Sequence, residues 1–178
     1  RIYKLNTSGT ILSSFASPSS SPTGLTYDGS NLWNADFNTD RIYKLNTSGT
    51  ILSSFASPGS YPTGLTYDGS NLWNADFNTD RIYKLNTSGT ILSSFDSPGP
   101  EPRGLAWDGS NLWHADASTD KIYKLNTSGT ILSSFDSPGP EARGLTYDGS
   151  NYLWHADNGT GKIYKIAAHS GLMLRAKN

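Results

Sequence analysis

Short apolar segments separated by turn residues recur along the whole chain. Residues 64–95 contain four such segments, at 64–67, 71–75, 81–85 and 90–95, each rich in aromatic or aliphatic side chains. Asp68-Gly69 follows the first segment and Thr87-Ser88-Gly89 follows the third, and both supply the positive φ that tight hairpins require. A helix is not predicted, because Gly, Ser, Thr, Asn and Pro interrupt every segment. The pattern therefore predicts four antiparallel β-strands.

The four-segment pattern repeats every 40 residues. The repeats are 1–40, 41–80, 81–120 and 121–162, with a partial repeat at 163–178. Adjacent apolar residues within the segments predict sheets that are buried on both faces. Four antiparallel strands in about 40 residues make one blade of a β-propeller. We therefore predict an all-β fold with a single domain over residues 1–178. It is a β-propeller of four complete blades plus an N-terminal half-blade, alone or as part of a larger or five-bladed ring.

The N-terminal half-blade is the part of the chain that remains when complete four-stranded blades are counted. Counted from Gly24, the fourth blade ends with strands at 162–166 and 172–174, which leaves a front hairpin at 1–15. The hairpin has the sequence of an interior repeat, whereas terminal repeats are usually atypical. Because an unpaired strand pair presents an open edge, we expect one of two partners for it. The hairpin either belongs to a blade that begins in a longer N-terminal part, or joins strands of another copy.

The recurring sequence Gly-Leu-Thr-Tyr-Asp-Gly-Ser-Asn-Leu-Trp, followed by Ala-Asp and by Arg-Ile-Tyr-Lys-Leu, resembles NHL and YVTN-type propeller repeats. It is also similar to repeats of the superfamily that contains gluconolactonase-like enzymes and streptogramin lyase. The resemblance implies the fold, and propellers host many unrelated functions. Gluconolactonase-like enzymes hold a metal with one Glu, one Asn and one Asp from different blades. Here Glu101 and Glu141 are the only glutamates, both in proline-rich loops, so that ligand set does not transfer and we predict no catalytic residue.

Composition excludes several classes of function. The 14 Lys and Arg residues nearly balance 15 Asp and Glu residues, for a net charge of −1 without blocks of like charge, so we predict no nucleic-acid partner. The chain has no Cys, which excludes disulfides and thiolate metal sites. No apolar run approaches the ~18 residues of a membrane span, so we predict no membrane insertion.

Differences between repeats concentrate in two connections, from the fourth strand to the next first strand and from the second strand to the third. In a four-stranded meander both connections emerge on the same face of the ring. We predict that this face binds a protein or carbohydrate partner, or other copies of the chain. The candidate residues are Phe37, Tyr61, Phe77, Glu101, Arg103, His114, Glu141, Arg143 and His155. The alternative is neutral drift of exposed loops after duplication.

Every repeat also carries Trp-Asn-Ala-Asp or Trp-His-Ala-Asp. Its carboxylates are Asp36, Asp76, Asp116 and Asp157. They could bind a divalent cation such as calcium through oxygen ligands. The favoured alternative is that each Asp accepts hydrogen bonds in its own turn, because a feature of every blade is usually architectural. We therefore predict no cofactor. His114 and His155, each two residues before an Asp, are further candidates for a metal ligand or general base.

Five asparagines match the N-glycosylation acceptor sequence, namely Asn6, Asn46, Asn86, Asn126 and Asn158. Tight turns favour the same residue types. The acceptor sequences and the absence of Cys favour an exported glycoprotein, outside the cell or on its surface. We predict a non-catalytic binding or scaffold module. The alternatives are a self-assembling cell-surface or filament subunit and a metal-dependent lactonase-like or lyase-like enzyme.

Overall fold

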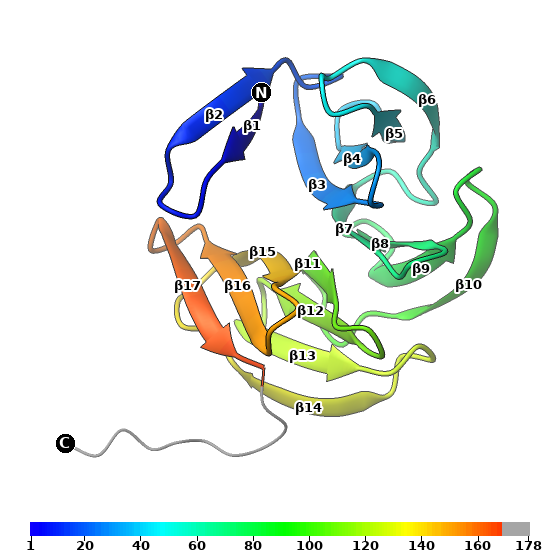
Figure 1. The fold of residues 1–178 in the computed structure, drawn as a ribbon. Helices are drawn as coiled ribbons and strands as arrows, with labels where there is room; N and C mark the ends of the chain where they lie inside the picture. Colours follow the sequence, from blue (N-terminus) through cyan, green and yellow to red (C-terminus); the bar gives the residue numbers. More distant parts are fainter. Residues whose placement is uncertain (169–178) are drawn as a thin grey trace.

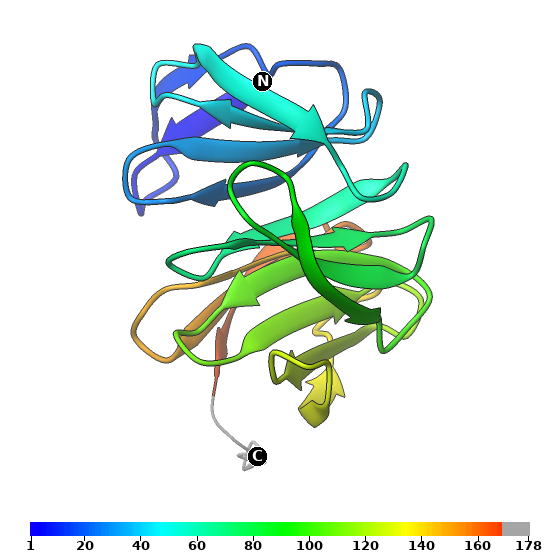
Figure 2. The same ribbon diagram turned by 90° about the vertical axis from the view of Figure 1, so that its right-hand side faces the viewer.

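The computed structural model describes residues 1–168, and its regular elements in that range are all β-strands. The strands form five antiparallel sheets, one two-stranded, three four-stranded and one three-stranded. Figure 1 shows them arranged around a central axis as a β-propeller. In the view turned by 90°, sheets that follow one another in sequence lie in layers, face against face (Figure 2). The predicted all-β propeller is confirmed.

The sheets follow one another in chain order. The front hairpin is β1 (Ile2–Leu5) and β2 (Ile11–Phe15). Blade 1 is β3 (Pro22–Tyr27), β4 (Leu32–Asp36), β5 (Arg41–Leu45) and β6 (Ile51–Ala56). Blade 2 is β7 (Pro62–Tyr67), β8 (Leu72–Asp76), β9 (Arg81–Leu85) and β10 (Ile91–Asp96). Blade 3 is β11 (Pro102–Trp107), β12 (Leu112–Asp116), β13 (Lys121–Leu125) and β14 (Ile131–Asp136). Blade 4 is β15 (Ala142–Tyr147), β16 (Tyr152–Asp157) and β17 (Lys162–Ala167).

The predicted strands of the second repeat agree with β7 to β10 to within two residues at each end. Gly69 and Gly89 adopt the positive φ expected of the hairpin turns, at 98° and 91°. The strand predicted at 162–166 is β17. The strand predicted at 172–174 lies outside the described residues, so blade 4 is described through its third strand.

The first strand of each blade lies innermost and lines a central channel. A glycine in this strand allows the next inner strand to approach closely. A Cβ on Gly24 would lie 2.6 Å from the carbonyl oxygen of Thr63, and one on Gly64 would lie 2.3 Å from that of Arg103. The inner strands β3, β7, β11 and β15 therefore lie side by side through backbone contact that a side chain would prevent.

Hydrophobic cores lie between blades rather than within them. Trp33, Ala35 and Ile42 of blade 1 pack with Leu65, Leu72, Tyr83 and Leu85 of blade 2. Equivalent clusters join blade 2 to blade 3 and blade 3 to blade 4. Both faces of a sheet are consequently buried, which explains why the strands lack strict polar and apolar alternation.

The front hairpin (β1 and β2) lies between blade 1 and blade 4 (Figure 1). The front hairpin lies beside blade 1, where Gly49 contacts the ring of Phe15 as Gly89 contacts that of Phe55. In the complete blades such a hairpin pairs with two inner strands, but among the described residues β1 pairs only with β2. Leu5 is therefore 51% exposed, whereas its repeat equivalent Leu45 is fully buried.

Candidate functional site

The two variable connections lie on one face of the ring, here called the loop face. In each blade they are joined by backbone hydrogen bonds. The Phe37 amide donates to the Ser21 carbonyl and the Phe77 amide donates to the Tyr61 carbonyl, both at 3.0 Å. The predicted placement of these connections on a common face is thus confirmed.

A buried aspartate ends the second strand of each blade, and in blades 1 to 3 it ties the two connections together. Oδ1 of Asp76 accepts hydrogen bonds from the Thr79 amide at 3.0 Å and the Thr79 hydroxyl at 2.9 Å, while its Oδ2 accepts from the Tyr61 amide at 2.9 Å. Asp36 and Asp116 form equivalent bonds. Asp157 accepts two bonds from Thr160 within its own turn. These carboxylates thus hold the turns and connections of their own blades together through hydrogen bonds, which is the architectural role given above as the alternative to cation binding.

The four aspartates also lie in separate blades. Within residues 1–168, no three His, Asp or Glu side chains gather closely enough to hold a metal ion. Burial raises the pKa of Asp157, but the hydrogen bonds from Thr160 outweigh it, and the pKa lies below its usual value. The Asp157 carboxylate is thus kept ionised by the hydrogen bonds of its own turn.

Three aromatic side chains form a continuous arc along the loop face. The ring of Phe37 meets that of Tyr61 edge to face, with centroids 4.2 Å apart, and Tyr61 lies 6.0 Å from Phe77. The guanidinium of Arg103 then stacks on Phe77, with Cζ 4.5 Å from the ring centre. This aromatic arc (Phe37, Tyr61 and Phe77) extends from blade 1 across blade 2 and ends at an arginine of blade 3.

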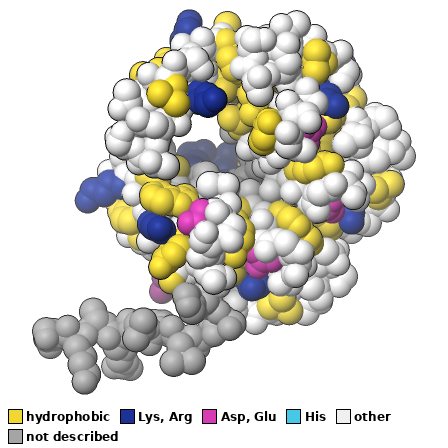
Figure 3. All heavy atoms as spheres, in the orientation of Figure 1, with side chains coloured by type: hydrophobic (Ala, Val, Ile, Leu, Met, Phe, Trp, Pro, Cys, Tyr) yellow, Lys and Arg dark blue, Asp and Glu magenta, His cyan; other side chains and the backbone are white. Residues whose placement is uncertain are grey.

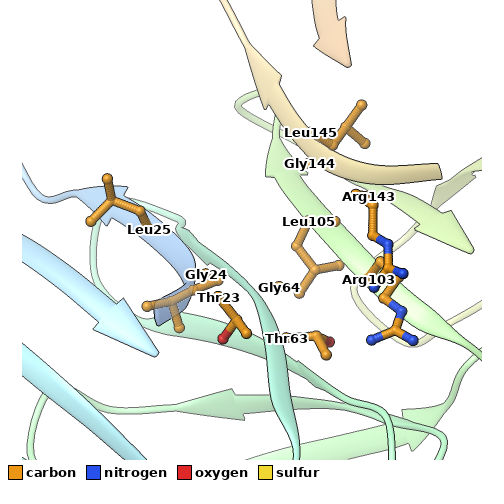
Figure 4. A pocket seen from close by; sticks show the side chains of 12 residues that line it. Thr23, Gly24, Leu25, Thr63, Gly64, Arg103, Leu105, Arg143, Gly144 and Leu145 are labelled. Carbon is orange, nitrogen blue, oxygen red and sulfur yellow. The ribbon is translucent and has the colours of Figure 1, made fainter. Parts of the chain in front are cut away.

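The arc leads to the mouth of the central channel. Four equivalent positions on the inner strands carry Thr23, Thr63, Arg103 and Arg143, and these side chains line a cavity of ≈ 310 Å³. In Figure 4, Arg103 and Arg143 extend side by side from neighbouring strands, with the two threonines across from them. The space-filling view shows the central opening, with Lys or Arg atoms visible inside it (Figure 3).

Glutamates flank the two arginines. Glu101 lies 3.3 Å from Arg103 and Glu141 lies 3.5 Å from Arg143. The Asn158 amide and Arg143 both donate to Glu141, and these bonds lower the pKa of its carboxyl. Burial lowers the pKa of Arg103, and the adjacent charge of Arg143 lowers it further, while Glu101 opposes the shift. Two like charges thus lie close together at the channel mouth.

The expectation that His114 and His155 lie on the binding face is wrong, because both are fully buried. Nδ1 of His155 donates to the Gly144 carbonyl at 3.0 Å and its Nε2 accepts from Ser137 at 3.0 Å. His114 makes the same two contacts with Gly104 and Ser97. Asn34 and Asn74 donate to the matching glycine carbonyls in blades 1 and 2. The histidines therefore replace asparagines as internal donors, which the sequence pattern did not reveal.

Four of the five glycosylation candidates lie in turns between third and fourth strands. Oδ1 of Asn46 accepts bonds from the Ser48 amide and hydroxyl and from the Thr50 amide, and the other repeats are equivalent. These bonds account for the turn sequence, and glycosylation stays a prediction. No helix in residues 1–168 is long and apolar enough to span a membrane.

The channel has a second mouth on the opposite face, which the sequence analysis did not single out. One aromatic side chain from each inner strand lies around a hollow of ≈ 370 Å³, namely Tyr27, Tyr67, Trp107 and Tyr147. All four occupy the same position of the repeat. This recurrence of an aromatic residue is the sequence signal that could have indicated the second mouth.

The fold and this channel define a β-propeller with a ring of inner strands around a central cavity, a class that includes binding proteins and enzymes. The Virginiamycin B lyase family model matches residues 1–174. The chain therefore belongs to the virginiamycin B lyase family. A search of curated protein sequences finds no significant match.

Several solved structures share the fold. Glutaminyl cyclase from Myxococcus xanthus has a TM-score of 0.69 at 14% identity, over 82% of this chain and 71% of that one. Virginiamycin B lyase from Staphylococcus aureus has a TM-score of 0.63 at 21% identity, over 92% of this chain and 61% of that one. A streptogramin B lyase has a TM-score of 0.57 at 25% identity, over 95% of this chain and 62% of that one. The chain thus spans about three fifths of the length of the two lyases.

Proposed function

We propose that the chain is a non-catalytic binding module whose ligand lies along the aromatic arc and reaches the channel mouth on the loop face. The observation that carries this proposal is the continuous contact from Phe37 through Tyr61 and Phe77 to Arg103. Rigid aromatic side chains bind ring-containing ligands at a low entropic cost, since each ring has only two torsions to order. The ligand class is therefore a molecule with a flat, apolar ring face.

Comparison between repeats argues that the arc is not needed to build a blade. Ser21 of the first repeat occupies the position of Tyr61, and Ala117 of the third repeat occupies the position of Phe77. In the first and third repeats alike, the two connections nevertheless keep the backbone hydrogen bond that joins them. Phe37 and Tyr61 are more than a third exposed, so their rings are accessible to a ligand. A surface role explains these side chains better than a structural one.

The test uses N-phenylnaphthylamine, a neutral aromatic fluorophore, titrated into the intact chain. Tyr61→Ser and Phe77→Ala introduce residues that the chain already uses at these repeat positions. We expect the double variant to bind the probe about thirtyfold more weakly, since each of the two lost ring contacts contributes about 1 kcal/mol. Tyr27→Ser, at the opposite channel mouth, is the matched control and should leave affinity unchanged. Weaker binding in the control, with unchanged binding in the double variant, would contradict the proposal.

Family membership supports a second candidate, a lyase acting on a streptogramin B antibiotic such as virginiamycin B. Because His114 and His155 are fully buried, neither can contact a ligand on the loop face. The assay is incubation of the chain with virginiamycin B, followed by chromatography of the products. Consumption of the antibiotic, abolished in a matched Arg143→Thr variant, would favour the lyase over the binding module.

A further inference from the structure

The channel position shared by the four inner strands has two distinct uses. The Thr63 hydroxyl lies 2.7 Å from the Pro102 carbonyl of the next inner strand and 3.0 Å from the Ala75 carbonyl of its own blade. Thr23 makes the corresponding bonds in blade 1. Threonine at this position thus joins neighbouring inner strands. In blades 3 and 4 the same position carries arginine, so a joining role alone does not account for Arg103 and Arg143.

The two arginines have more donors than partners. Each has five N–H groups, and the side-chain partner of each is one glutamate oxygen at 3.3 Å or 3.5 Å. The Nε atoms of Arg103 and Arg143 are both buried without a hydrogen-bond partner among the described residues. An unpaired buried donor destabilises the protein unless a ligand or water completes it. Two adjacent guanidinium groups therefore offer unused hydrogen bonds in one place.

Charge at the channel mouth favours the same class of ligand. Arg103 and Arg143 extend in parallel from neighbouring strands (Figure 4), so their positive charges repel each other. The two glutamates lie further toward solvent, with side chains 40% and 51% exposed, against 19% and 42% for the arginines. A guanidinium can keep its glutamate partner and still bind a second oxygen anion through its other N–H groups.

We infer that Arg103 and Arg143 form an anion-binding subsite at the channel mouth, which holds a carboxylate or phosphate group of the ligand. This inference rests on the proposed binding function, because the arc ends at Arg103 and the anion would be attached to the ring body along the arc. Both groups present two or more oxygens to paired N–H donors, which is the geometry that arginine binds best. Beyond the arginines, Leu25, Leu65, Leu105 and Leu145 line the cavity and disfavour deeper entry of a charged group.

The test compares two probes that share one aromatic scaffold. Anilinonaphthalene sulfonate carries an anionic group that N-phenylnaphthylamine lacks. Arg143→Thr is the principal variant, because threonine occupies this position in two other blades and Arg143 does not contact the arc. We expect about tenfold weaker binding of the sulfonate and less than a twofold change for the neutral probe, since hydrogen bonds to a charged group are the strong ones. Arg143→Lys should lie between wild type and Arg143→Thr.

Competition distinguishes the two sources of the anion. Inorganic phosphate and benzoate are titrated separately against the bound sulfonate probe, and the stronger competitor identifies phosphate or carboxylate as the preferred group. An equal loss of both probes in Arg143→Thr, or no loss of either, overturns the inference. If the neutral probe does not bind the wild-type chain at all, the proposed function fails. If it binds, but Arg143→Thr leaves the ratio of the two probe affinities unchanged, only the subsite is overturned. Thermal melting of each variant checks that the fold is retained.

Discussion

Acid should destabilise this propeller through its two buried histidines, and repeat-matched substitution of both should remove the effect. Burial lowers the pKa of His114 from 6.5 to about 4, although Asp116 and the Gly104 carbonyl oppose the shift. The unfolded chain therefore binds a proton at a higher pH than the folded chain does. This stability is fully present above pH 6.5 and is lost as the pH falls from 6.5 toward 4. Burial lowers the pKa of His155 in the same direction.

The magnitude follows from the two pKa values. One pKa unit corresponds to about 1.4 kcal/mol, so the complete shift of His114 corresponds to about 3 kcal/mol. Between pH 7 and pH 5 the loss from His114 alone is about 2 kcal/mol, before most carboxylates begin to titrate. Asn34 and Asn74 occupy the equivalent positions and donate to the same glycine carbonyl at 2.9 Å. Asparagine therefore keeps the hydrogen bond and removes the titration.

The assay is urea unfolding of the wild type and of the His114→Asn/His155→Asn variant at several pH values between 5 and 7. We expect the free energy of unfolding of the wild type to fall by about 2 kcal/mol or more over this range, and that of the variant to change by less than about 0.5 kcal/mol. An equal loss in both proteins would refute the reasoning from buried histidines.

Four further predictions concern stability, and the first two use matched positions of the repeat. Leu45→Ala should lower the free energy of unfolding by about 3 kcal/mol and Leu5→Ala by less than about 1 kcal/mol, since Leu45 is fully buried and Leu5 is 51% exposed. Equal losses in the two variants would mean that the front hairpin is covered. Gly64→Ala should lower the melting temperature far more than Gly144→Ala. A Cβ at position 64 would lie 2.3 Å from a backbone oxygen, whereas one at position 144 would meet only a side-chain carbon at 3.3 Å. Similar shifts in the two variants would argue against direct contact between the inner strands. Asp76→Ala should cost about 3 kcal/mol, because three donors lose their acceptor. Neither calcium nor a chelator should move the wild-type melting temperature, and a calcium-dependent rise would restore the cation alternative.

Much of the fold was predictable from local sequence. Asp68-Gly69 and the turn at Gly89 require positive φ, and this requirement together with the 40-residue period led to four-stranded antiparallel blades. The common face of the variable connections followed from meander topology alone. Arg103 and Phe77 were both candidates, but their stacking was not predictable, because they lie in different blades and only the curvature of the ring brings them together.

The histidines show where repeat comparison misleads. His114 and His155 differ from the asparagines of the first two repeats, and variation of this kind suggested a surface position. In the structure they are buried and perform the same hydrogen bonding as asparagine. A residue that changes between repeats thus lies either at an exposed position without structural constraint or at a buried position where both residue types make the same hydrogen bond. The sequence alone does not separate the two cases.

By itself, the sequence determined the strands, the turns, the four-stranded blade and the face on which the blades differ, because these depend on contacts between residues close along the chain. Only the tertiary structure decided which side chains meet around the channel, how deeply each is buried, and that Leu5 is exposed where Leu45 is covered. The physical reason is that cores and channel lie between blades, so each residue's environment depends on a repeat about 40 residues away. Near-identical repeats therefore differ in energy according to their neighbours in the ring.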